Sequence, residues 1–302
     1  MKTLSLPHHP ERPADSHKGQ WGRVLVIAGS ARYPGAAILA AQGAGRAGAG
    51  LVEVAVPKGL GAMVLPAVPF AILREEPHEP GGGFSSTAGR GLLEAAALAD
   101  AVVLGPGLGT AESTLRLLEI LLEGISAPLV LDADGLNLLA ALGVGALHSR
   151  PGPTILTPHP GEFARLEGGG VPPETERTAR TGSLAARLKA LIVLKGRGTV
   201  VTDGDRVYVE SAGNPGMATG GMGDVLSGIL GALLAVISEP AEAAALAVHL
   251  HALAGDLAAQ ELGQEAVLPG DVVERYGRAL RNWRQGGEGQ PSQSTDGPNR
   301  IS

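Results

Sequence analysis

The sequence predicts a three-layer α/β/α sandwich with a mainly parallel central sheet. Short apolar runs such as residues 23–29 (RVLVIAG) are typical of strands that are buried on both faces. Helix-like segments alternate with these runs, and this alternation favours parallel strands joined by helices. Aromatic residues make up only 3% of the chain, and Ala, Leu, Val and Gly take their place, which suits helices packed closely on a sheet.

The same alternation assigns the elements in chain order. A hairpin is expected about two thirds of the way along the chain, because residues 200–202 and 206–209 flank Asp203-Gly204-Asp205, a favourable turn sequence. The last third is expected to be helical over residues 221–237, 241–262 and 271–283. Before the hairpin, strands are expected at 23–29, 51–56, 101–104, 128–131, 154–156 and 191–194, and helices at 34–47, 112–122 and 174–190.

No linker interrupts this pattern, so residues 1–284 are predicted to form one catalytic domain. The first 20 residues lack a clear period and are expected to be an irregular lead-in. Residues 285–302 are polar and rich in Gly, Pro and Ser, and we expect them to form a disordered tail.

Composition excludes several function classes. The chain has no cysteine, so it offers no disulfide, thiolate ligand or thiol nucleophile. No apolar run reaches the roughly 18 residues of a membrane span, and the first 22 residues lack a signal core, so we expect a cytoplasmic protein without a membrane partner. The net charge is −6 and basic residues form no dense block, which argues against nucleic acid and favours small-molecule substrates.

The segment 211–230 (SAGNPGMATGGMGDVLSGIL) carries the strongest chemical signal. Its glycines run directly into an apolar helix, so backbone N–H groups without helical partners can bind an anion such as phosphate. Asp224 lies in the first turn of that helix, where a carboxylate would repel phosphate. Asp224 is therefore expected either to cap the helix or, as we prefer, to act as the general base that deprotonates an attacking hydroxyl.

Several motifs in consistent order extend this signal to a family resemblance. GMATGGMGDVLSGIL resembles the GxGD signature of ribokinase-like small-molecule kinases. SHKGQWGRVLVIAGS, YPGAAILAAQGAGRAGAGLV, LGPGLG, LDADGLN, LTPHPGEFARL and LKGRGTVV together resemble ADP-dependent NAD(P)H-hydrate dehydratase over residues 16–283. The resemblance implies a ribokinase-like fold. It also implies that the protein repairs cofactors by dehydrating NADHX and NADPHX to NADH and NADPH. In this reaction ADP is the phosphoryl donor, Mg²⁺ is the cofactor, and AMP and phosphate are released. It covers the dehydratase alone, without the epimerase domain that is often fused ahead of it.

The resemblance also implies roles for individual residues. The hydrated substrate is expected to contact Ala36 or Ala37, Gly107, His159 and Asp224. The loop of Lys195, Gly196, Arg197, Gly198 and Thr199 is expected to bind the nucleotide, and Gly223 to contact its phosphate. His159 stands between two prolines in what is expected to be a short rigid loop, where ligand contact is preferred over a purely structural hydrogen bond.

Acidic residues near these motifs are candidates for the metal. Glu162 is the expected residue that orders Mg²⁺ through the phosphates, since Mg²⁺ needs only one or two carboxylates beside phosphate oxygens. Asp132 and Asp134 follow a predicted strand and are second candidates, and Asp134 could equally cap the following helix.

Other signals are set aside or remain as rivals. Residues 43–48 satisfy G-x-G-x-x-G, but a helix ends and a strand begins there, so close helix–sheet packing is the preferred explanation. His249 and His251 are two residues apart and face different directions on a helix, and His8, His9 and His17 are expected to be solvated. The rival functions are a kinase of a vitamin-precursor alcohol and a catalytically silent nucleotide sensor. A homo-oligomer, in this family commonly a tetramer, is expected.

Overall fold

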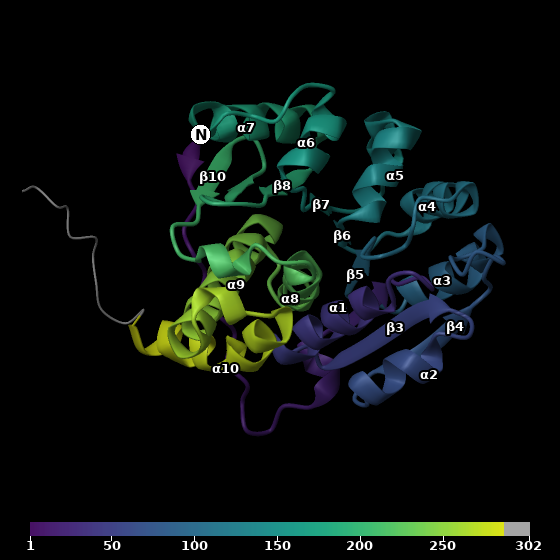
Figure 1. Ribbon diagram of the computed structural model, residues 1–302, viewed down its shortest axis with the longest axis horizontal. Coiled ribbons are helices and arrows are strands. Elements are labelled where there is room, and N and C mark those ends of the chain that lie inside the picture. Colours follow the sequence, from purple (N-terminus) through teal and green to yellow (C-terminus); the bar gives the residue numbers. More distant parts are fainter. Residues whose placement is uncertain (287–302) are drawn as a thin grey trace, which may run out of the picture.

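The computed structural model describes residues 1–286 and contains a ten-stranded sheet with helices on both faces (Figure 1). The strands follow the order β1-β10-β9-β8-β7-β6-β5-β2-β3-β4. Every neighbouring pair is parallel except the two that involve β9, which runs antiparallel to both β8 and β10. The strands are β1 (Lys2–Thr3), β2 (Arg23–Ile27), β3 (Leu51–Pro57), β4 (Ile72–Glu76), β5 (Ala101–Leu104), β6 (Leu129–Leu131), β7 (Thr154–Leu156), β8 (Leu191–Leu194), β9 (Val200–Thr202) and β10 (Arg206–Val209).

Two hydrophobic cores fill the spaces between the sheet and its helices. Successive side chains of β2 alternate between them, because Val24 and Val26 belong to one core and Leu25 and Ile27 to the other. Helices α1 (Pro34–Arg46), α8 (Met222–Leu234), α9 (Pro240–Leu262) and α10 (Pro269–Gly286) cover the first face, with the short α2 (Gly61–Val64) beside them. The second face is covered by α3 (Gly89–Ala96), α4 (Glu112–Gly124), α5 (Asp134–Leu142), α6 (Pro160–Glu167) and α7 (Arg177–Leu188). The three-layer prediction is confirmed.

Glycines let α1 and α8 touch backbone to backbone. A Cβ on Gly228 would lie 1.9 Å from the Ala40 carbonyl oxygen, and a Cβ on Gly43 would lie 2.4 Å from the Val225 carbonyl oxygen. The run 43–48 is therefore not a dinucleotide loop, as expected. Gly43 serves contact with a second helix, however, rather than the helix–sheet packing that the sequence suggested.

Some elements differ from the predictions. The lead-in is not wholly irregular, because Lys2 pairs with Arg206 of β10. Strand β4 escaped detection because it is an edge strand with few apolar residues, and its Arg74 and Glu76 belong to a charged network around Glu53 of β3. The predicted tail at 285–302 overlaps α10 at its first two residues, and its remainder lies outside the described residues.

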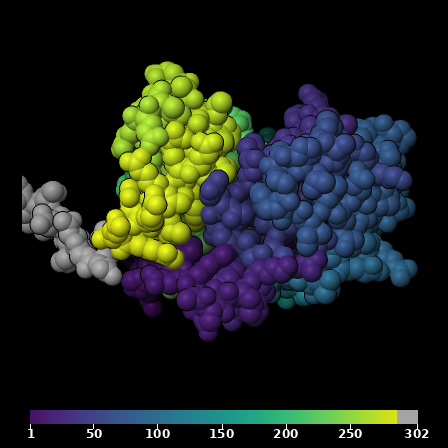
Figure 2. All heavy atoms as spheres, turned by 90° about the horizontal axis from the view of Figure 1, so that it is seen from below, coloured from purple at the N-terminus to yellow at the C-terminus, as the bar shows by residue number. Residues whose placement is uncertain are grey.

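The N-terminal segment is held against the helical layer (Figure 2). In that view it runs as a purple band beside α10. Arg284 of α10 donates hydrogen bonds to His9 Nδ1 and to the Pro10 carbonyl, and Arg12 donates to the Gly48 carbonyl at the end of α1. His9 is thus half-buried and not solvated as expected. Within residues 1–286, no helix is long and apolar enough to cross a membrane.

Two helical glycines give opposite predictions for the same substitution. Gly228→Ala should lower the free energy of unfolding by at least about 2 kcal/mol, because its Cβ has no space against α1. Gly277→Ala in α10 is the control: a Cβ there meets nothing within 4 Å, so it should stabilise by about 0.5–1 kcal/mol. Urea unfolding of both variants measures this, and a Gly228→Ala protein as stable as the wild type would show that the helix contact is looser than described.

Candidate active site

The glycine-rich segment ends at the N-terminus of α8, as predicted. Gly221 precedes the helix in a left-handed conformation with φ of 94°. The Met222 and Val225 N–H groups bond to the Thr219 and Gly221 carbonyls, whereas within residues 1–286 the N–H groups of Gly223 and Asp224 have no protein acceptor. Two unpartnered N–H donors at the positive end of a helix are able to bind an anion.

A buried ion pair lies directly beside these donors. Lys195 Nζ, at the end of β8, is 2.6 Å from Asp132 Oδ1, at the end of β6. The Ser227 hydroxyl of α8 donates to Asp132 Oδ2 at 2.7 Å. A Cβ on Gly223 would lie 3.0 Å from Lys195 Nζ, so the ammonium lies close against the first turn of α8. The cluster therefore forms at the carboxyl ends of parallel strands, where α/β sheets bind ligands.

Lys195, Asp132, Glu162 and Asp224 form a carboxylate cluster with more negative than positive charge. The pKa values of its three carboxyl groups reflect this balance and their burial. Burial would raise the pKa of Asp132, but Lys195 and the hydrogen bonds outweigh burial and hold it below its ordinary value. Burial raises the pKa of Asp224 to about 7, and the Asp132 charge adds to that effect. Burial likewise raises the pKa of Glu162 to about 7, although Lys195, 4.0 Å away, opposes the rise. Asp224 can therefore exchange a proton near neutral pH.

His159 and Glu162 form the N-terminal cap of α6. His159 Nδ1 accepts hydrogen bonds from the N–H groups of Gly161 and Glu162, and Glu162 Oε2 accepts from the His159 N–H at 2.8 Å. His159 therefore lies in the short loop between β7 and α6, as its prolines suggested, and it also caps the helix. Burial and the nearby Lys195 charge lower the pKa of His159, so the ring is neutral with its proton on Nε2. Half of the side chain remains exposed, so the histidine can also contact a ligand.

The three small residues expected at the substrate behave differently. Gly107, after β5, has a φ of 63°, and a Cβ on it would lie 2.8 Å from the Cβ atoms of both Ala36 and Tyr33. Gly107 and Ala36 are thus neighbours across the first turn of α1. Ala37 is fully buried and faces the Gly29 turn, so Ala36 is the better candidate for a ligand contact.

The loop from Lys195 to Thr199 joins β8 to β9. Gly196 and Gly198 have positive φ values of 130° and 63°, which turn the chain sharply. Arg177 of α7 donates to the Leu194 and Lys195 carbonyls and fixes the start of the turn. Arg197 is exposed. The Lys195 ammonium points into the carboxylate cluster, where its side chain is 19% exposed.

Asp134 orients a neighbouring loop. It is the first residue of α5, and its Oδ2 accepts from the Gly109 N–H at 2.8 Å. The alternative role as a helix cap is not found, since Ala133 occupies that position. Likewise, Asp224 lies in the first turn of α8 and makes no capping hydrogen bond in the described part of the chain.

Some contributors were missed in the sequence. Ser227 could have been noticed as the one polar residue that follows Asp224 in an otherwise apolar helix, four positions after Gly223. Arg177 gives no local signal, because its contact depends on how α7 packs beside β8. Among residues 1–286, no group of three or more His, Asp or Glu side chains is arranged to hold a metal ion by itself.

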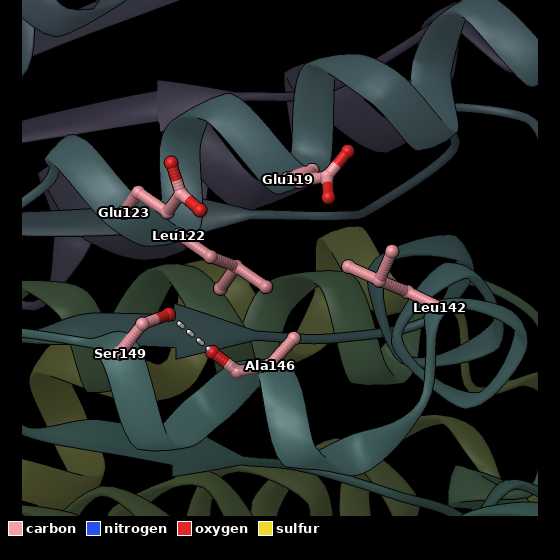
Figure 3. Close-up of a pocket in the computed structure, with 6 residues that line it drawn as sticks. All are labelled: Glu119, Leu122, Glu123, Leu142, Ala146 and Ser149. Carbon is pink, nitrogen blue, oxygen red and sulfur yellow. Dashed lines mark hydrogen bonds between the residues drawn. The ribbon is translucent and has the colours of Figure 1, made fainter.

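A surface hollow of about 270 Å³ lies elsewhere, between α4 and the segment that follows α5 (Figure 3). Its lining is Glu119, Leu122, Glu123, Leu142, Ala146 and Ser149, and it shares no residue with the carboxylate cluster. It offers no basic group or free backbone donor set for a phosphate, so the cluster is the candidate active site.

Comparisons with known proteins match almost the whole chain. The NAD(P)H-hydrate dehydratase family model matches residues 24–277. The bifunctional NAD(P)H-hydrate repair enzyme of Moorella thermoacetica is 42% identical over 275 residues, which cover 90% of this chain and 52% of that enzyme. The chain thus spans about half the length of the curated relatives it matches.

Solved structures share the fold along nearly their full length. The ADP/ATP-dependent NAD(P)H-hydrate dehydratase of Bacillus subtilis, co-crystallised with ATP and Mg²⁺, has a TM-score of 0.78 and 32% identity, covering 91% of this chain and 95% of that one. A ribokinase-like superfamily protein from Enterococcus faecalis has a TM-score of 0.77 and 29% identity, covering 90% and 91%. The ribokinase-like fold expected from the motifs is confirmed.

The buried ion pair gives a prediction about stability. Lys195→Met should cost about 3–5 kcal/mol at pH 7, because Asp132 would be left charged without a partner. The loss should shrink as the pH falls, since the pKa of Asp132 is no longer held down and the protonated side chain carries no charge. Urea unfolding measures both effects. The double variant Lys195→Met/Asp132→Asn should recover much of the loss, and simple addition of the two single costs would contradict the pairing.

Proposed function

Because the chain belongs to the NAD(P)H-hydrate dehydratase family, we propose that it dehydrates NADHX and NADPHX to NADH and NADPH. A purine nucleotide donates the phosphoryl group that makes the hydroxyl of the hydrate a good leaving group. The observation that carries the proposal is the pair of unpartnered N–H groups at Gly223 and Asp224, beside a carboxyl whose pKa is about 7. These groups can hold a phosphoryl group and deprotonate the alcohol that attacks it.

The reaction takes place in two stages. Asp224 removes the proton from the C6 hydroxyl, whose oxygen attacks the terminal phosphorus while the bond from that phosphorus to the nucleotide breaks. The electron pair of the ring nitrogen then expels phosphate from C6, and loss of a proton from C5 restores the dihydropyridine ring. With ADP as donor, the products are AMP, phosphate and the reduced cofactor.

Each neighbouring group has a proposed task. The loop from Lys195 to Thr199 binds the nucleotide, and its two glycines leave room for close approach to the phosphates. Gly107 and Ala36 carry no side chain larger than a methyl group, which leaves room for the nicotinamide ring to approach them. The Nε2–H of His159 is a neutral donor that can bond the hydrate without adding charge.

The residues also fit Mg²⁺, which would be held mainly by phosphate oxygens. Burial raises the pKa of both Glu162 and Asp224 to about 7, and the Asp132 charge adds to the rise, so a divalent cation would find carboxylates there that lack a full counter-charge. The ion would neutralise the phosphoryl oxygens during transfer. We propose Glu162 as its nearest carboxylate. ADP is the proposed donor, and the Bacillus subtilis relative is described as using ADP or ATP.

Direct turnover tests this proposal. Protein mixed with chemically prepared NADHX, Mg²⁺ and either ADP or ATP should restore the NADH absorbance and release one phosphate per NADH. The ratio of the two rates gives the donor preference. Accumulation of a phosphorylated alcohol without NADH would indicate the kinase alternative, and nucleotide binding with unchanged absorbance would indicate a silent sensor.

The raised pKa of Asp224 predicts a pH dependence. Asp224 must be ionised to take the proton, so kcat/KM should fall about tenfold per pH unit below about pH 7.

Asp224→Asn should lose at least about 10³-fold in kcat but still bind nucleotide. Asp205→Asn, at an exposed hairpin position, makes the same chemical change and should keep wild-type activity. Normal turnover by Asp224→Asn would show that Asp224 is not the general base.

A further inference from the structure

The glycine-rich loop, residues 211–221, needs an external support. It joins β10 to α8 and contains a single short helical turn, η6 (Pro215–Met217), among the described elements. Its glycines favour many backbone conformations. Yet the loop must hold the N–H groups of Gly223 and Asp224 in one place. Something outside the loop therefore fixes it.

Helix α9 provides this support through Asp256. Asp256 Oδ2 accepts a hydrogen bond from the Gly213 N–H at 2.9 Å, and Oδ1 accepts from Asn214 Nδ2, also at 2.9 Å. Asn214 Nδ2 also donates to the Gly255 carbonyl, and Asn214 Oδ1 accepts from the Gly216 N–H at 3.0 Å. One carboxylate thus organises both the backbone and a side chain of the loop, and bonds to a charged acceptor are the strong ones.

The loop fits onto α9 beside that carboxylate. A Cβ on Gly255 would lie 2.2 Å from Met217 Sδ, so only glycine allows Met217 to rest on the helix at this position. The far end of the loop is also confined, because a Cβ on Gly221 would lie 2.5 Å from Leu39 of α1 and 3.0 Å from Pro269 of α10. The Asp256 contact therefore acts on a loop that has little freedom at its other end.

A second group on α9 holds the start of the loop. His249 Nδ1 lies 3.0 Å from Glu210 Oε2, which also accepts from the Tyr208 hydroxyl at 2.7 Å. Glu210 Oε1 in turn accepts from the Ala212 N–H at 2.7 Å. His249 and Asp256 are seven residues apart, two helical turns, so they lie on the same face of α9. This arrangement gives a use to a histidine that the sequence left without one.

We propose that Asp256 is a positioning residue of the active site, which holds the glycine-rich loop so that the α8 N-terminus faces the transferring phosphoryl group. The proposal rests on the proposed function, because it assigns the loop its phosphoryl-binding task. Asp256 acts through Asn214 and the loop backbone and does not touch substrate. Its effect is therefore on transition-state geometry, where small displacements of binding groups cost large factors in rate.

The experiment compares Asp256→Ala and Asp256→Asn with the wild type and with Asp203→Asn. Asp203 is a matched control, since its carboxylate also accepts backbone N–H bonds, from Asp205 and Arg206, in the β9–β10 hairpin. We expect Asp256→Ala to lower kcat about 10- to 100-fold per folded molecule while KM for the nucleotide changes less than about threefold. The kcat of Asp256→Asn should lie between those of the wild type and Asp256→Ala. The asparagine oxygen can accept from one of the two donors, Gly213 or Asn214, but its NH₂ group then faces the other donor and cannot accept from it.

Hydrogen exchange gives a readout that does not depend on turnover. Amides of residues 211–221 should exchange about tenfold faster in Asp256→Ala, and those of β2 and β5 should remain as in the wild type. Wild-type kcat in folded Asp256→Ala, or unchanged exchange in the loop, would overturn the proposal. So would a rate loss explained entirely by the unfolded fraction. If the wild type itself does not turn over NADHX, the proposed function fails, whereas the exchange result still decides whether Asp256 holds the loop.

Discussion

The buried contact between Lys195 and Asp132 is the interaction on which the site depends. It ties the end of β8 to the end of β6, and the Ser227 hydroxyl ties α8 to the same carboxylate. Two strands and one helix therefore meet at the Asp132 side chain, which is 1% exposed. The ammonium that neutralises Asp132 also limits how far the pKa of Glu162 rises. The same ion pair thus joins the elements of the site and influences the pKa values of its carboxyl groups.

Backbone contact between helices makes this meeting point possible. Because Gly43 and Gly228 carry no side chain, α8 lies directly on α1. The N-terminus of α8 then reaches the strand ends, where Gly223 lies beside Lys195 and Asp132. The N–H donors proposed to bind the phosphoryl group thus begin α8, and Ala36, proposed to face the nicotinamide ring, lies in the first turn of α1.

Local pattern predicted most of this structure, and contacts between distant segments account for the rest. The apolar runs at β2, β5 and β8 and the glycines before α8 were recognisable because burial and backbone freedom leave local signals. Strand β4 was missed because its side chains pair with charges on β3. His159 lies in the short loop that was expected, but its role as the cap of α6 was not predicted, although Pro160 and Glu162 are typical of a first helical turn. The contacts of Asp256 could not be predicted from the sequence, because its partners Asn214 and Gly213 lie 42 and 43 residues away.

The enclosure of α8 has a consequence for how its field reaches a ligand. All of its residues except Gly223 and Asp224, at its open N-terminal end, are buried, so protein and not water surrounds the body of the helix. Mobile ions screen charges at a surface but do not enter such an interior. The attraction of its N-terminus for an anion should therefore persist at ionic strengths that weaken an exposed basic patch. An anion site of this design relies on dipoles that are fixed by folding and needs no net positive charge, which agrees with an acidic chain.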